Sequence, residues 1–272
     1  MTSLNEKTAL FRKLHGPGEI LVLPNAWDAG SARLIEETGA KAIATSSAAV
    51  SWAHGYADGE TIPPETLLHA VREIARVTRI PLSVDAEAGL DATPDMVAEL
   101  VVKLVEAGAS GINLEDGNAS PDLLVAKIKA IKDAVKRKGA DIYINARADV
   151  YLRELSAPEG PREAMIARGK AYAAAGADGF FAPGVADIAD IKAIAGAVQA
   201  PLNILVWPGL APVAELKAAG VRRVSAGSGM ARAALGALKS ATKQLLEEGT
   251  YDAMFKSAEG LQNMNALFAR KG

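Results

Sequence analysis

Charged side chains end three neighbouring apolar runs of this sequence. Asp85 and Glu87 close the first run, Glu115 the second and Arg147 the third. Runs of this kind are typical of buried parallel strands, whose carboxyl ends meet on one side of a sheet. Carboxylates that converge there repel one another unless a cation lies between them. The pattern therefore predicts a bound divalent metal ion.

The types of side chain indicate which metal ion is bound and which substrate the pocket accepts. Asp85, Glu87 and Glu115 offer hard oxygen ligands, which suit Mg²⁺, or Mn²⁺ in its place, and some of them would act through a metal-bound water. Arg147 carries a forked cation that suits a carboxylate. Together they predict a pocket for a small oxo acid, with the metal stabilising an enolate oxygen.

Each of these residues also has a purely structural explanation. An acid at the end of a strand can cap the helix that follows it. Arg147 can pair with Asp149 or with Glu115. The functional interpretation depends on their joint occurrence in consecutive strands.

The elements that position these residues alternate between strand and helix. Strands are predicted to start near residues 20, 41, 82, 110, 142, 178, 202 and 222. Helices are predicted at 31–38, 64–78, 94–107, 121–137, 161–175, 187–198, 211–219 and 229–247. Eight alternations predict an α/β fold of the (β/α)₈ TIM barrel type. A doubly wound open sheet is the alternative, but the glycine-rich turn expected after its first strand is missing.

Glycines mark four of the predicted helix ends. Gly39, Gly108, Gly176 and Gly220 each stand between a helical pattern and the next apolar run. We expect these residues to adopt the left-handed conformation that commonly ends a helix.

The end of the chain does not fit the eightfold repeat. Residues 250–270 have an amphipathic pattern and predict a ninth helix with no strand to cover. This helix would pack on a neighbouring subunit or cap its own barrel. We predict one barrel domain over residues 1–272, with 246–272 as a C-terminal helical extension. The apolar positions of the predicted helix are Met254, Leu261, Met264, Leu267 and Phe268.

Composition narrows the class of protein. The 272 residues are 50% hydrophobic with a formal net charge of -2, which is typical of one soluble barrel and gives no sign of nucleic-acid binding. Cysteine is absent, so disulfides and a cysteine nucleophile are excluded. No signal peptide and no apolar run of the roughly 18 residues that a membrane span needs can be recognised, so we expect a cytoplasmic protein.

Taken together, the three apolar runs and the charged residues that end them resemble the isocitrate lyase/phosphoenolpyruvate mutase superfamily, and the resemblance is strongest over residues 20–150. The resemblance implies an α/β barrel, assembled as a dimer or tetramer that swaps a C-terminal helix. It implies that Asp85 binds Mg²⁺ directly, with Glu87 and Glu115 in the metal shell. Arg147 would grip the substrate, and Asp58 matches a loop aspartate near the metal.

The resemblance also implies a substrate-binding set. The turn formed by Thr45, Ser46 and Ser47 looks like the family's turn that holds a substrate carboxylate through a serine and backbone amides. Two further candidates for substrate binding come from position alone: Asn113, on the strand that ends in Glu115, and Trp27, at the end of the first strand. The alternative for Trp27, which we favour, is packing at the rim of the barrel.

The chain departs from the superfamily pattern on one side of the site. The lyases carry a loop with lysine, cysteine and histidine after the second acidic strand, whereas residues 116–124 are short and lack all three. Ala182-Pro183-Gly184 and Trp207 also stand where the lyases have other strings. The expected general acid is therefore missing, while the half of the site that stabilises an enolate is kept.

Three functions remain open. The leading hypothesis is an Mg²⁺-dependent lyase that cleaves a C–C bond of a small 2-oxo or 2-hydroxy carboxylic acid. The second is a phosphoenolpyruvate phosphonomutase or another P–C bond enzyme, which would share the metal site. The third is a catalytically reduced barrel that binds an oxo acid as a sensor or a structural oligomer.

Overall fold

The computed structural model describes residues 3–90, 93–155 and 158–269, and its centre is a parallel sheet. Neighbouring strands follow the order β1-β9-β8-β7-β6-β5-β4-β3-β2. The described strands are β1 (Leu21–Leu23), β2 (Asn25–Ala26), β3 (Ile43–Thr45), β4 (Leu82–Asp85), β5 (Gly111–Glu115), β6 (Tyr143–Arg147), β7 (Gly179–Ala182), β8 (Leu202–Leu205) and β9 (Val221–Ser225).

The first strand segment closes this sheet into a barrel. Its halves β1 and β2 are separated only by Pro24, and they pair with β9 and β3 respectively. The side chain of Asn25 ties the two edges together, since it donates to the carbonyl of Thr45 at 2.7 Å and accepts from the amide of Gly227 at 2.9 Å. The predicted TIM barrel is confirmed, with its first strand counted twice because Pro24 interrupts it.

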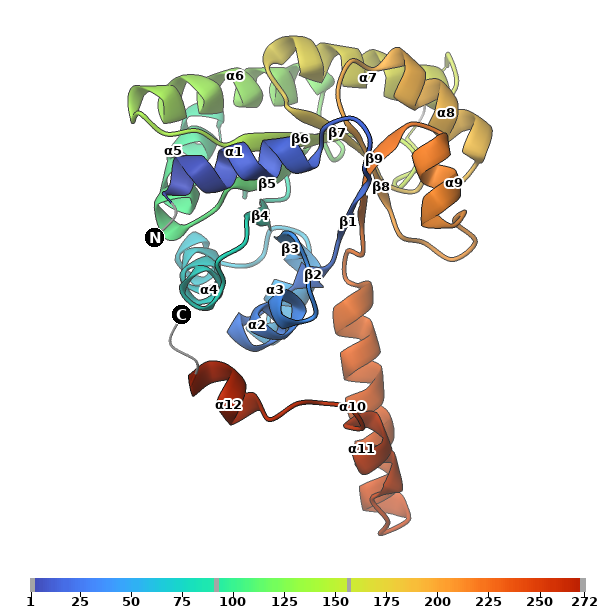
Figure 1. Ribbon diagram of the computed structural model, residues 1–272. Coiled ribbons are helices and arrows are strands. Elements are labelled where there is room, and N and C mark those ends of the chain that lie inside the picture. The colour runs from blue at the N-terminus through green and yellow to red at the C-terminus, as the bar shows by residue number, and fades with distance from the viewer. Residues whose placement is uncertain (1–2, 91–92, 156–157, 270–272) are drawn as a thin grey trace.

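Helices cover the outside of the barrel (Figure 1). Their bounds agree with the predicted ones to within about two residues in most cases, and Gly39, Gly108, Gly176 and Gly220 have the expected positive φ. The main core lies between helices and strands. The helices that follow strands are α2 (Ala29–Glu37), α3 (Ser47–Ala53), α4 (Pro64–Val77), α5 (Pro94–Ala107), α6 (Pro121–Arg137), α7 (Pro161–Ala175), α8 (Ile188–Ala197), α9 (Val213–Ala218) and α10 (Gly229–Glu247).

Two helices were not predicted. Helix α1 (Leu4–Leu14) starts with a capping box between Ser3 and Glu6, and its fully buried Phe11 packs against Tyr143 and apolar residues of the barrel interior. Its end of the barrel is thus filled with side chains. Helix α3 follows β3 directly and begins at the turn that carries Ser46.

The C-terminal segment differs from its prediction. Instead of one helix over 250–270, the chain forms α11 (Asp252–Ser257) and α12 (Met264–Ala269), because Gly260 adopts a φ of 77° and the backbone between them is not helical. Helix α10 projects away from the barrel, and α12 returns to contact α2 (Figure 1). Large apolar side chains of this segment stay exposed, among them Leu238 (62%), Leu246 (78%) and Phe255 (64%).

Candidate active site

Strand register brings the predicted residues to one mouth of the barrel. Asp85 on β4 stands opposite Asn113 on β5, and Glu115 at the end of β5 stands opposite Arg147 on β6. All four lie at or near the carboxyl ends of their strands, which is the functional face of a TIM barrel.

An ion-pair cluster occupies the ends of β5 and β6. The Nη1 atom of Arg147 lies 2.6 Å from Oε2 of Glu115, and its Nε donates to Oδ1 of Asp149 at 2.6 Å. These three side chains expose 14%, 7% and 0% of their surface. Both structural alternatives for Arg147 are therefore realised at once, and its contact with a substrate stays a prediction.

Asp85 is held from one side only. Its Oδ2 accepts a hydrogen bond from the amide of Ser47 at 3.1 Å, and its own amide donates to Oγ1 of Thr45 at 2.8 Å. Its Oδ1 is buried and has no hydrogen-bond partner among the described residues. Because a buried carboxylate oxygen without a partner is costly, this atom is a candidate metal ligand. Thr45 and Ser47 thus support Asp85, while Ser46 caps α3.

Glu87 lies on a strained loop beside Asp85. Its φ of 51° is unusual for a residue other than glycine and typical of functional sites. Two bonds hold this loop: Oε2 of Glu87 accepts from the amide of Glu60 at 2.7 Å, and Nζ of Lys127 donates to the carbonyl of Ala88 at 2.6 Å. Burial, together with the nearby acids Asp85, Asp58 and Glu60, raises the pKa of Glu87 to about 7, although the hydrogen bond from the Glu60 amide lowers it. Asp58 itself is exposed.

The raised pKa of Glu87 predicts how pH affects the metal-free protein. Because the folded state holds this proton more tightly than the unfolded one, the contribution of Glu87 to stability is complete below about pH 4.5 and is lost as pH rises through about 7. The loss should reach roughly 3 kcal/mol. In urea unfolding with EDTA, Glu87→Gln should therefore match the wild type at pH 4.5 and exceed it at pH 8.

The exposed Glu106 offers a control for this experiment. Glu106→Gln should leave the difference between the two pH values unchanged. If Glu87→Gln and the wild type keep the same stability difference at pH 4.5 and pH 8, the carboxyl is not perturbed as described.

Asn113 connects the mouth of the barrel to its interior. Its Oδ1 accepts from Nδ2 of Asn145 at 2.9 Å and from Nη2 of Arg223 at 3.2 Å. Arg223 is fully buried, and its Nε and Nη1 have no partner among the described residues. Trp27, the other predicted substrate contact without a charge, is partly buried and packs against the outer core. Both assignments to substrate binding stay predictions.

Sequence reasoning missed Arg153 and considered Asp149 only as a structural partner of Arg147. Asp149 is fully buried and accepts from Arg147 and, at 2.8 Å through Oδ2, from Nε of Arg153. Arg153 also places its Nη2 3.4 Å from Oε1 of Glu115. The sequence does contain a signal for them, because Arg147, Asp149 and Arg153 follow one another closely at the end of one predicted strand and in the loop after it.

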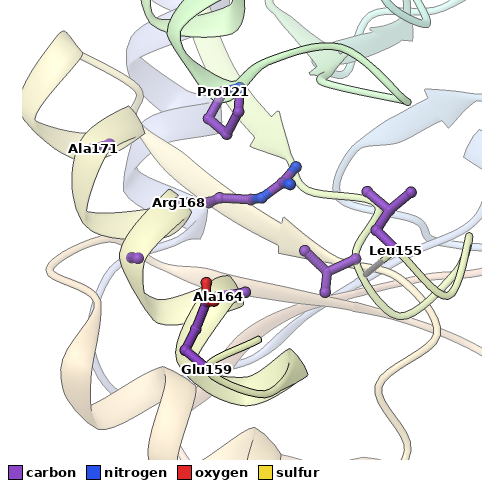
Figure 2. A pocket seen from close by; sticks show the side chains of 8 residues that line it. Pro121, Leu155, Glu159, Ala164, Arg168 and Ala171 are labelled. Atoms are coloured by element: carbon purple, nitrogen blue, oxygen red, sulfur yellow. The ribbon is translucent and has the colours of Figure 1, made fainter. Parts of the chain in front are cut away.

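A cavity of about 240 Å³ lies on the outer side of this cluster, between α7 and the loop that follows β6 (Figure 2). None of the predicted site residues lines it. Its Arg168 donates to Oδ2 of Asp116 at 2.7 Å, and Oδ1 of Asp116 accepts from the amide of Asp149. Asp116 therefore links Arg168 in the cavity wall to the backbone of Asp149 in the ion-pair cluster.

The donor set fits a magnesium ion that retains several waters. The described residues contain no group of three or more His, Cys, Asp or Glu side chains already arranged around a metal position. Asp85 nevertheless presents a free buried oxygen, and Glu87 and Glu115 approach it closely enough for Asp85 to raise the pKa of both. Mg²⁺ is usually bound through one or two carboxylates, so such an arrangement suffices.

Comparison with known proteins places this site in a family. The family model described as phosphoenolpyruvate phosphomutase matches residues 11–246. The chain belongs to this family. The predicted membership of the isocitrate lyase/phosphoenolpyruvate mutase superfamily is thereby confirmed, and with it the prediction of an enzyme of that type.

Relatives of this phosphomutase family member carry several activities in their names. A probable 2-methylisocitrate lyase of Corynebacterium glutamicum is 32% identical over 210 residues, which cover 72% of this chain and 65% of that protein. An oxaloacetate decarboxylase of Pseudomonas paraeruginosa is 31% identical over 237 residues, which cover 82% and 79%. A crystal structure of a putative lyase/mutase from Burkholderia cenocepacia J2315 superposes with a TM-score of 0.89, is 34% identical and covers 98% of this chain and 96% of that one.

Within residues 3–90, 93–155 and 158–269, no helix combines the length and the apolar character needed to cross a bilayer.

Proposed function

We propose that this protein is an Mg²⁺-dependent lyase that cleaves a C–C bond of a small 2-oxo or 2-hydroxy carboxylic acid. The observation that carries this proposal is the free buried oxygen of Asp85 on the same strand-end face as Arg147. The named activities of the relatives from Corynebacterium and Pseudomonas, a 2-methylisocitrate lyase and an oxaloacetate decarboxylase, support this substrate class.

Asp85 would hold the metal directly, and Glu87 and Glu115 would bind its water ligands. When bound there, Mg²⁺ polarises the carbonyl oxygen of the acid. Arg147 would orient the substrate carboxylate through the N–H groups that its bonds to Glu115 and Asp149 leave over. The fixed position of this guanidinium, set by Asp149, keeps the geometry ready before the substrate arrives.

A substrate panel tests the proposed function. Oxaloacetate, 2-alkylmalates and phosphonopyruvate would be incubated with the enzyme and Mg²⁺, and products followed by proton and phosphorus NMR. We expect pyruvate or another 2-oxo acid from a carbon substrate, and no reaction with EDTA. Conversion of phosphonopyruvate alone would replace the proposal with a P–C bond activity, and binding without any product would indicate a catalytically reduced barrel.

We further propose that the protein is a homo-oligomer through its C-terminal segment. The exposed leucines of α10 and the exposed Phe255 of α11 form apolar surface that a second copy can cover. Light scattering should give the mass of a dimer or tetramer, and Leu238→Lys should reduce it. A wild-type monomer at micromolar concentration would contradict this assembly.

A further inference from the structure

A second guanidinium reaches the mouth of the barrel beside Arg147. Arg153 lies in the loop after β6, and its Nε donates to Oδ2 of Asp149 at 2.8 Å. Its Nη2 lies 3.4 Å from Oε1 of Glu115, at the end of β5. Arg147 and Arg153 thus bind the same two carboxylates from different sides.

The two arginines differ in what they leave free. The side chain of Arg147 is 14% exposed, whereas that of Arg153 is 40% exposed. Within the described part of the chain, Arg153 donates through Nε and through one long contact of Nη2. Its Nη1 donates to none of these residues. A guanidinium has five N–H donors, and Arg153 therefore keeps several of them for a ligand in the mouth.

Arg153 places a positive charge beside a loop that has no positively charged residue of its own. The loop after β5, residues 116–120, contains no cation. Gly117 of this loop lies directly under the guanidinium, since a Cβ atom there would lie 3.9 Å from Nη2 of Arg153. Asp149 anchors Arg153 through Nε, and the Arg153 side chain remains 40% exposed. A fixed, half-exposed guanidinium next to a substrate pocket is suited to recognising a carboxylate.

We propose that Arg153 is a specificity-determining residue that binds a second carboxylate of the substrate, so that the enzyme selects 2-oxo acids with two acidic groups. This inference rests on the proposed function, in which Arg147 binds the first carboxylate. Arg153 binds the acidic group at the other end of the molecule, on the side of the residues 116–120 loop. A monocarboxylic analogue has no group for Arg153 to bind and is a poorer substrate.

Paired ligands separate this role from a structural one. Oxalate, added with Mg²⁺, has no atoms beyond its two adjacent carboxylates and probes the metal and Arg147 alone. The C4 amide of oxaloacetate lacks the second acidic group and cannot lose CO₂, so it is measured as an inhibitor of oxaloacetate turnover. Arg153→Gln should lower kcat/KM for oxaloacetate by about 10- to 100-fold, mostly through KM, and leave oxalate inhibition within about twofold. Arg153→Lys should restore part of the loss.

The exposed Arg162, which pairs with Glu163 on α7, gives a matched control. Arg162→Gln should change neither the kcat/KM for oxaloacetate nor the inhibition by oxalate. Inhibition of the wild type by the amide at concentrations near the KM of oxaloacetate, or a parallel loss of oxalate binding in Arg153→Gln, would overturn this assignment. Absence of both turnover and oxalate binding in the wild type would instead reject the proposed function.

Discussion

Replacing Asp85 with alanine should abolish Mg²⁺ binding and reduce kcat/KM by on the order of 10³-fold or more. The substitution removes the one described carboxylate at this mouth that presents a buried oxygen with no protein partner. It also removes the acceptor of the Ser47 amide, but that single bond of 3.1 Å is a small part of the fold. Calorimetric titration with Mg²⁺ and steady-state kinetics on the substrate found in the panel measure both effects.

Two variants keep this result interpretable. Asp85→Asn preserves the shape and the bond to Ser47, and should lose activity as severely as the alanine variant because the charge is gone. Asp95→Ala, on the exposed first turn of α5, should match the wild type in both assays. If Asp85→Ala bound Mg²⁺ with unchanged affinity, the ion would have to lie elsewhere.

Replacing Asp149 with alanine should destabilise the fold by about 3–5 kcal/mol. This side chain has no exposed surface and is the shared partner of Arg147 and Arg153, so its loss leaves the buried Arg147 with only Glu115. Urea unfolding measures the effect. The surviving folded protein should also be less active, because Arg147 is no longer held in position.

The exposed Asp133 on α6 provides the matched control for this loss. Asp133→Ala should change stability by no more than about 0.5 kcal/mol. Asp149→Asn tests the same charge with a smaller change in shape, and should fall between the two. An unchanged unfolding midpoint for Asp149→Ala would contradict the view that this carboxylate anchors the cluster.

The barrel could be predicted from the sequence because its signals are local. A helix that must stop requires a residue with positive φ, and Gly108 and Gly176 supply it at positions where a helical pattern meets an apolar run. The carboxyl ends of parallel strands share one face, so Asp85, Glu115 and Arg147 could be grouped without coordinates.

Other features depend on contacts between distant residues. Sequence alone could not decide whether Arg147 binds a ligand or pairs with Asp149, and the structure shows that it pairs with Asp149 and Glu115 together. The bonds of Thr45 and Ser47 to Asp85 could not be predicted for the same reason, since they span 38 or more residues, and the contact of both residues with a substrate stays a prediction. The break between α11 and α12 follows from Gly260, which the amphipathic pattern of residues 250–270 concealed.

The most direct test is a crystal structure of the protein soaked with Mn²⁺ and oxalate, with an anomalous map collected for manganese. We expect one manganese peak at the mouth of the barrel, within about 2.0–2.2 Å of Oδ1 of Asp85, and oxalate between that ion and Arg147. A map with oxalate bound but no manganese peak near Asp85, or with Oδ1 of Asp85 bonded to a protein group, would contradict a metal-dependent site.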